Sequence, residues 1–179
     1  KYGRGHADLK FTHYGDEFGD NDEIAWAECE LFLATGDAAF EKDLESRLDP
    51  TDPKTRRYGW RRLTDAYGNA IRSYAFAARS GRLPATALDA RYLRICEGEV
   101  LAAGDDAVGW SKSSAYATPF PTATKAGLGA GWDFSLDQAS DMAVAYQIEP
   151  KPAYLDALVG AMNYEGGTNP VNVTYLTGR

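Results

Sequence analysis

The sequence predicts an all-α chain of about six helices arranged as helical hairpins. Three observations predict this class. Apolar residues recur at spacings of three and four along most of the chain, glycine or proline follows each such segment, and hardly any segment alternates like a strand. Short connections on one side and longer ones on the other favour a curved helical array over a four-helix bundle.

The first helix is predicted over residues 22–35, where apolar side chains form one stripe. The polar run 20–22 supplies N-cap candidates, and Gly36 is the natural C-terminal stop. A shorter helix is predicted over residues 38–48, closed by the prolines of segment 50–53.

The third helix is predicted over residues 61–79, with a glycine soon after its end. The fourth is predicted over residues 85–103 and is expected to stop at Gly104. Residues 104–133 are rich in Gly, Ser, Thr and Pro and show no steady period, so we expect a long loop there. A loop of that length usually has a function.

A fifth helix is predicted from Ser135, whose spacing to Gln138 is that of a capping box, to about Gln147. The sixth follows the next two prolines and ends at Gly166-Gly167. Residues 171–175 alternate in polarity, and this short segment is either one edge strand or an extended tail.

Composition excludes two classes of partner. The chain has 179 residues, with 19 basic and 26 acidic side chains and a net charge of −7, so its mean field would repel a phosphate backbone. No apolar run approaches the roughly 18 to 20 residues that cross a bilayer. We therefore expect neither a nucleic-acid nor a membrane partner. No signal peptide is visible at the N-terminus.

The cysteines and aromatic residues bear on the core and on binding surfaces. Cys29 and Cys96 each lie within an apolar helical pattern, which favours two buried thiols over a disulfide. The 11 Tyr and 4 Trp suit a surface that binds sugar or peptide, because each ring joins a flat apolar face to a polar edge. They would equally fill the core between Ala-rich helices, and composition does not separate these uses.

Two segments near the ends of the chain carry a family resemblance. Residues 14–37 read YGDEFGDNDEIAWAECELFLATGD, and residues 163–178 read NYEGGTNPVNVTYLTG. Between them, residues 131–135 read GWDFS. In this order and at this distance the segments resemble glycoside hydrolase family 9, whose members have a helix that contains a Trp and ends in ATGD, and a later Asn-Pro turn. The resemblance spans roughly residues 14–178, and the middle of this range matches the family mainly in the order of its predicted helices.

This resemblance implies a fold and an activity. The family fold is an (α/α)6 barrel of twelve helices, so residues 1–179 are expected to be a single helical domain that forms the middle part of a larger one. Arg179 then resembles an interior cut, and the remainder of the parent chain is an expected partner. The implied substrate is β-1,4-glucan or a related polysaccharide or oligosaccharide, and that substrate class implies a secreted or periplasmic protein.

The family's catalytic carboxyl groups are expected outside this chain. Family members use an aspartate base in an Asp-Ala-Gly-Asp motif and a glutamic acid in an Asp-x-x-x-Asn-Glu segment, and neither motif occurs here. The resemblance therefore implies an inverting hydrolase of which this chain supplies the cleft wall, and the chain by itself is expected to be inactive.

Aromatic residues are the candidate substrate-binding groups. The C–H face of a pyranose packs on an indole ring, while the sugar hydroxyls seek hydrogen bonds at its edges. Trp26 and Trp132 occupy positions where family members line the cleft, and Trp60, Trp110 and Tyr116 are further candidates. For each of them, filling the core or the loop is the alternative role.

The densest carboxylate cluster precedes the first helix. Asp16, Asp20 and Asp22 could supply oxygen ligands to calcium, which would be a structural ion, since no cofactor is required. The same charges also suit the N-terminal end of a helix dipole. Two rival functions remain open: a non-catalytic helical-hairpin module that binds a glycan or peptide, and a complete small enzyme that uses the carboxylates of residues 16–23.

Overall fold

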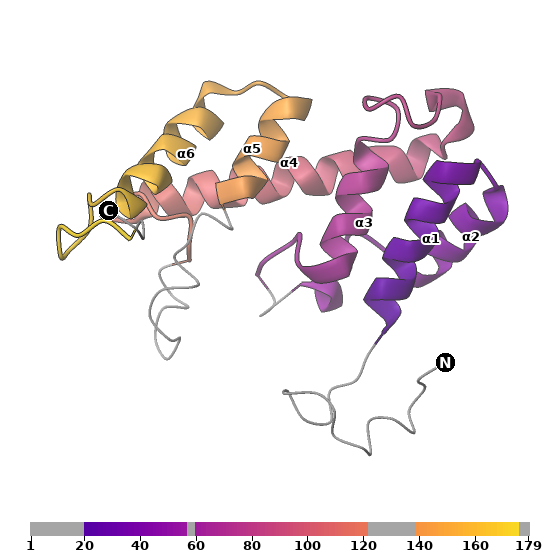
Figure 1. The fold of residues 1–179 in the computed structure, drawn as a ribbon, viewed down its shortest axis with the longest axis horizontal. Coiled ribbons are helices and arrows are strands. Elements are labelled where there is room, and N and C mark those ends of the chain that lie inside the picture. The colour runs from indigo at the N-terminus through magenta and orange to yellow at the C-terminus, as the bar shows by residue number, and fades with distance from the viewer. Residues whose placement is uncertain (1–19, 57–59, 122–138, 176–179) are drawn as a thin grey trace, which may run out of the picture.

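The computed structural model describes residues 20–56, 60–121 and 139–175. Within these ranges the chain forms six α-helices and two short 3₁₀ turns and contains no β-strand, which confirms the all-α class (Figure 1). The helices are α1 (Asn21–Thr35), α2 (Ala38–Arg47), α3 (Asp65–Ala75), α4 (Ala90–Ser113), α5 (Ala139–Ile148) and α6 (Pro152–Glu165), and the turns are η2 (Pro53–Thr55) and η3 (Ala85–Ala87).

Helices α1, α3 and α5 run in the same direction. The charge of Asp22, at the start of α1, acts on Tyr67 near the start of α3, and the Ser73 hydroxyl farther along α3 donates to Glu30 farther along α1. In Figure 1 each of the helices α1, α3 and α5 starts at its lower end and runs upward. Every other helix of the array therefore presents its N-terminus to one edge.

Helix α4 runs opposite to α3 and is shared by both ends of the array. Arg62, just before α3, pairs with Asp106 in the second half of α4, whereas Tyr74 at the end of α3 packs edge-on against Tyr92 at the start of α4. Helix α4 also contacts α5 and α6 and lies behind α3 and α5 in Figure 1. The second half of α4 thus lies beside the segment that precedes α3.

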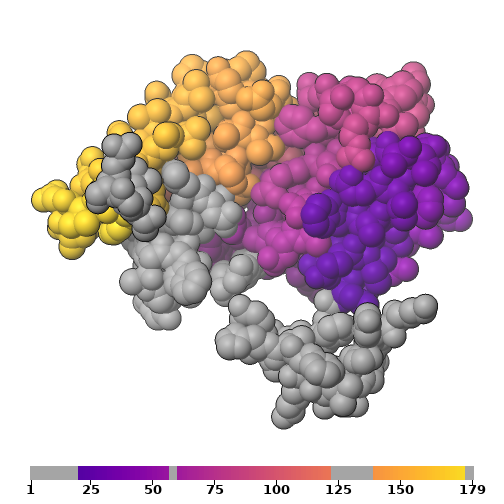
Figure 2. All heavy atoms as spheres, in the orientation of Figure 1, coloured from indigo at the N-terminus to yellow at the C-terminus, as the bar shows by residue number. Residues whose placement is uncertain are grey.

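A continuous cluster of buried apolar side chains connects all six helices. Its centre is Tyr74, whose ring stacks on Phe32 with centroids 6.0 Å apart and meets Tyr92 edge-on at 4.9 Å. Cys29 and Cys96 are fully buried in this cluster and are free thiols, as the sequence predicts. Small alanines fill much of the remainder, so the helices pack closely (Figure 2).

Helix α4 differs from its prediction, because Gly104 does not end it. The helix continues to Ser113, and a Cβ built on Gly104 would lie 2.5 Å from the Cβ of Ala145 and 3.0 Å from Cε1 of Tyr154. Gly104 is therefore a contact glycine that lets α5 and α6 approach α4. The helix also begins later than expected, at Ala90, and the long loop predicted over residues 104–133 begins only at residue 114.

Helix α3 is shorter than predicted at both ends, since residues 60–64 fold back on it. A Cβ on Gly68 would lie 2.4 Å from the carbonyl carbon of Leu63, so only glycine allows this approach. Two further boundaries agree with the sequence: Gly36 ends α1 in the left-handed region with φ of 71°, and Pro152 is in the first turn of α6. The start predicted for the fifth helix, Ser135, lies outside the described residues. Asp20 caps α1 without a side-chain hydrogen bond.

Three further expectations concern the C-terminal segment, a helix cap and the absence of a membrane-spanning helix. Residues 171–175 form no strand: Val171 lies in a turn, Asn172 has φ of 52°, and the N–H of Tyr175 donates to the carbonyl of Glu165. The predicted capping box of Ser135 and Gln138 lies outside the described residues. No helix in the described ranges combines the length and the apolar character needed to traverse a bilayer.

Candidate functional site

Polar side chains gather at the edge where α3 and α5 begin. There they surround a pocket of about 260 Å³, here called the polar pocket. The residues that line it come from the segment before α3, from the first turns of α3 and from the start of α5: Arg61, Leu63, Thr64, Asp65, Asn69, Arg72 and Ser140. Amide, hydroxyl, carboxylate and guanidinium groups meet here, which suits a ligand with several hydroxyl groups.

Arg72 lines the polar pocket and is held in place by two contacts. Its Nη2 lies 2.6 Å from Oδ1 of Asp141, whose side chain is 5% exposed, and the same nitrogen donates to the carbonyl of Leu63 at 2.9 Å. The pair thereby ties α5 and the segment before α3 to one side chain of α3. Asp65 follows that segment with φ of 51°, an unusual backbone region for a residue other than glycine.

A second ion-pair network lies beside the polar pocket. Arg62 pairs with Asp106 at 2.6 Å and with Glu99 at 3.0 Å, and Arg56 approaches Glu99 at 3.5 Å. Burial alone would lower the pKa of Arg62, but its hydrogen bonds to Asp106 and Glu99 outweigh burial and raise that pKa. Both carboxylates are therefore engaged in ion pairs with arginine.

Two of the predicted tryptophans meet next to this network. Trp60 packs edge-on against Trp110, with centroids 5.1 Å apart, and against the buried ring of Phe120 at the same distance. Trp110 lies in α4 and not in a loop as expected. Both indoles are half-buried, so each has ring surface in the packing and ring surface open to solvent.

Two of the other three predicted aromatic residues, Trp26 and Tyr116, are among the described residues. Trp26, on α1, is 39% exposed and its Nε1 donates to Oε1 of Glu30 at 3.1 Å. Tyr116, just after α4, is 41% exposed and packs edge-on against Tyr164 of α6. Trp132 lies outside the described residues.

The predicted carboxylate cluster is only partly described. Asp20 and Asp22 lie at the start of α1, and Asp16 falls outside the described ranges. A hydrogen bond with Asp22, together with burial, raises the pKa of Glu23. Among the described residues, no three His, Cys, Asp or Glu side chains are placed to hold a metal ion. The calcium site stays a prediction.

Comparison with known proteins identifies the family. A sequence model described as glycosyl hydrolase family 9 matches residues 3–179. The chain belongs to glycosyl hydrolase family 9. Among solved structures it is similar to a metagenome-derived glycoside hydrolase family 9 endoglucanase, with 21% identity and a TM-score of 0.66. The match covers 92% of this chain but 28% of that one, and no curated protein matches.

The likeness in fold shows that this family-9 chain forms part of an (α/α)6 barrel. The chain spans 28% of the length of the endoglucanase that it resembles. Its alternation of helix direction, with α1, α3 and α5 beginning at one edge, is what a barrel of paired helices requires.

The Asn-Pro turn of the family-9 chain has a structural role. Asn169 is 2% exposed, and its Nδ2 donates to the carbonyls of Tyr164 at 2.9 Å and Val173 at 2.8 Å. Its Oδ1 accepts from the backbone N–H of Val171 at 3.2 Å. One amide side chain thus closes the turn after α6, which explains why this motif stands out in the sequence.

Sequence reasoning missed most of the polar pocket. Asn69 and Arg72 are three residues apart on a helix whose other face is apolar, and that spacing places both on one side of α3. The polar run Arg61-Arg62-Leu63-Thr64-Asp65, which leads into the helix, was the second signal. No such signal in the sequence marked Ser140, because its position near α3 follows only from the tertiary fold.

Proposed function

We propose that this family-9 chain forms the substrate-binding part of an inverting glycoside hydrolase that acts on β-1,4-glucan or a related polysaccharide. The observation that carries the proposal is the polar pocket beside the pair of Trp60 and Trp110, at one edge of a barrel-type helical array. Polar groups that converge next to aromatic ring faces suit a pyranose, which has a C–H face and a rim of hydroxyls.

Within this proposal the pocket side chains have separate tasks. Asn69 and Ser140 would donate to and accept from sugar hydroxyls, and Arg61 would donate to them. Because the rings of Trp60 and Trp110 are perpendicular, one of them would stack on a sugar unit and the other would meet the edge of that unit. Trp26, Trp132 and Tyr116 would meet other units of the same polymer. Arg72 would hold the pocket in shape and would not bind the sugar itself, because its guanidinium is already paired with Asp141.

The chemical step would need carboxyl groups beyond those of the polar pocket. In inverting hydrolysis one carboxylate activates water while a carboxylic acid protonates the leaving oxygen, about 6.5–9.5 Å away. The two motifs that carry these groups in the family are absent from the sequence. The chain would therefore bind the polymer, and the remainder of a parent chain would supply acid and base.

An exposed apolar stripe on α6 supports a role for further helices. Leu155, Val159 and Met162 are 41%, 53% and 54% exposed and recur at spacings of four and three. Such a stripe usually packs against another helix. The rest of an (α/α)6 barrel would cover it, and because a glucan polymer lies outside the cell, the parent protein would be secreted or periplasmic.

Titration with cellohexaose tests the binding role. We expect Asn69→Ala to weaken binding by about two- to tenfold, the value of one neutral hydrogen bond. Gln147→Ala is the matched control, since Gln147 lines a different pocket between α3 and α5. Equal affinity of Asn69→Ala, Gln147→Ala and the unsubstituted chain for cellohexaose would overturn the assignment of the polar pocket.

A hydrolysis assay tests the division of labour. The chain alone should release no new reducing ends from cellohexaose, while a parent protein that carries both family motifs should. Release by the chain alone, abolished by Asp16→Ala or Glu23→Ala, would instead support a complete small enzyme. Binding of a peptide in preference to cellohexaose would support the non-catalytic module.

Calcium is a separate proposal, carried by Asp16, Asp20 and Asp22. Addition of calcium to EDTA-treated protein should raise the thermal unfolding midpoint, because a ligand that binds only the native state stabilises it. Asp22→Asn should reduce that rise. No rise in the parent protein would overturn the proposal.

A further inference from the structure

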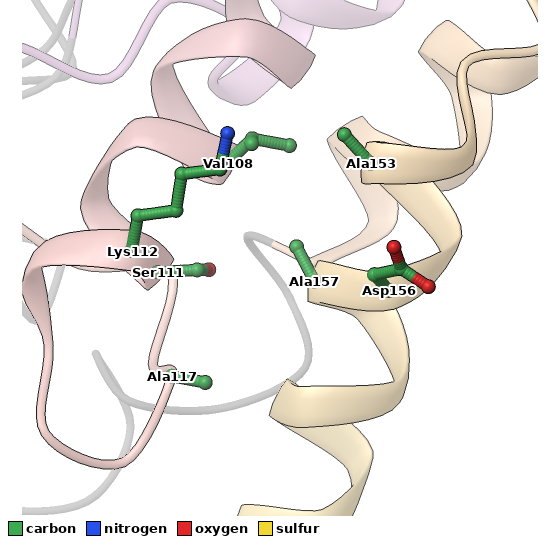
Figure 3. A pocket seen from close by; sticks show the side chains of 7 residues that line it. All are labelled: Val108, Ser111, Lys112, Ala117, Ala153, Asp156 and Ala157. Carbon is green, nitrogen blue, oxygen red and sulfur yellow. The ribbon is translucent and has the colours of Figure 1, made fainter.

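A second pocket lies between α4 and α6, apart from the polar pocket. Its volume is about 370 Å³, which is within the usual range for small-molecule sites. It is lined by residues of the second half of α4, the turn that follows and the first half of α6 (Figure 3): Val108, Ser111, Lys112, Ala117, Ala153, Asp156 and Ala157. We call it the α4–α6 pocket.

The hydroxyl group of Ser111 has no hydrogen-bond partner within the described structure, although the residue is only 4% exposed. A helical serine commonly bonds back to a carbonyl of the preceding turn, as Ser113 does with the carbonyl of Trp110 at 2.9 Å. Ser111 instead points across the pocket toward Ala157 (Figure 3). A buried hydroxyl without a partner is unfavourable, and a ligand oxygen at this point would satisfy it.

The remaining walls restrict the ligand that could do so. Methyl groups of Val108, Ala153 and Ala157 face each other across the gap, so the body of the ligand must be apolar and thin enough to fit between two helices (Figure 3). A sugar does not suit these walls, because most of its hydroxyls would lose their hydrogen bonds to water without replacement.

The charged groups around the pocket favour a neutral aromatic ligand. Lys112 extends along α4 toward Val108, where its ammonium can meet the face or the oxygen of a ring (Figure 3). Asp156 lines the same pocket, and the chain carries a net charge of −7, so an anion would gain little. The two charges at the pocket offset each other.

We propose that the α4–α6 pocket binds a small neutral phenol, with its ring between the methyl groups of α4 and α6 and its hydroxyl on Oγ of Ser111. This site is separate from the sugar-binding surface. It does not depend on the proposed function, since no residue of the polar pocket lines it.

Methyl-resolved NMR of the purified protein tests the proposal, with phenol and toluene as probes. The alanine methyls of Ala117, Ala153 and Ala157 report on the pocket directly. Phenol should shift these methyls saturably and bind more tightly than toluene, by about two- to tenfold for one neutral hydrogen bond. No shift up to the solubility limit of phenol, or equal affinity for both probes, would overturn the proposal.

Two variants separate the hydroxyl from the cavity. Ser111→Ala should keep toluene binding and lose the preference for phenol, whereas Ser113→Ala, the matched control, should keep that preference. Ala157→Leu should fill the pocket and abolish binding of both probes, with Ala143→Leu as the control in the pocket between α3 and α5. If Ala157→Leu fails to fold, the comparison of the two serine variants still decides the outcome.

Discussion

Arg72 and Asp141, 69 residues apart in sequence, form an ion pair of 2.6 Å that joins α3 to α5 under the polar pocket. The Asp141 side chain is 5% exposed and that of Arg72 is 23% exposed. A charge this deeply buried depends on its partner, because the protein interior replaces little of the solvation that water provides. The pair therefore supports the shape of the pocket as well as the contact between the helices.

We expect Arg72→Met to destabilise the protein by about 3 kcal/mol, because Asp141 would lose the charge that compensates its burial. Arg79→Met is the control: it breaks the exposed pair of Arg79 and Glu97 and should cost less than about 1 kcal/mol. Urea unfolding measures both. Equal losses in the two variants would contradict the assigned role of the buried pair.

Substitution by alanine should change the stability of the protein in opposite directions at Gly104 and at Gly109. A Cβ on Gly104 would lie 2.5 Å from Ala145, so Gly104→Ala should separate α4 from α5 and cost about 1–3 kcal/mol. Gly109 lies in the same helix with nothing within 4 Å of its Cβ position, so Gly109→Ala should stabilise by about 0.5–1 kcal/mol. Thermal unfolding of the two variants checks the sign of each change.

Stability should fall at alkaline pH because of the two buried thiols. Burial raises the pKa of Cys29 to about 12 and also raises that of Cys96, whereas an exposed thiol titrates near about 8.5. Above that pH the unfolded state releases protons that the native state retains, so each thiol should lower stability by about 1.4 kcal/mol per pH unit until its native pKa is reached.

Urea unfolding at pH 8 and pH 9.5 measures this loss of stability. Cys29→Ala should show a shallower fall between the two pH values than the parent protein, even though the variant starts from a lower stability. Parallel falls in the two proteins would show that Cys29 is not responsible.

Trp26 should contribute to binding of the polymer through its exposed ring face. Its indole N–H bond to Glu30 holds the ring in place, so less side-chain freedom is lost on binding. Trp26→Ala should weaken cellohexaose binding by about two- to tenfold, as for one aromatic contact, and Trp26→Phe by less. Leu31→Ala is the control, since Leu31 is also exposed on α1. Equal effects of Trp26→Ala and Leu31→Ala would argue against stacking.

The sequence predicted the helices better than their ends, and three glycines show why. Gly36 ends a helix, Gly68 lets a loop approach one, and Gly104 lets three helices meet, yet all three follow or interrupt similar apolar patterns. A glycine that relieves a close contact resembles a glycine that ends a helix until the neighbouring element is known. The error at the end of α4 has this cause, whereas α3 is shorter than predicted because residues 60–64 fold back on it.

The candidate site was predictable only as far as local pattern carries information. The sequence supplied Trp60 and Trp110 as separate candidates, but their edge-on contact depends on how α4 passes the segment before α3. Arg72 and Asp141 offered no sequence signal of their pairing, because ion-pair partners that are distant in sequence leave no local periodicity. Their juxtaposition comes from the tertiary fold alone.

Because α4 contacts α3, α5 and α6, and one buried apolar cluster includes all of them, neither half of the array has a hydrophobic core of its own. Melting α4 at any point would expose apolar surface on both sides of it. The most slowly exchanging backbone amides of α1 and of α6, which lie at opposite ends of Figure 1, should therefore exchange through one shared cooperative opening, with the same opening free energy.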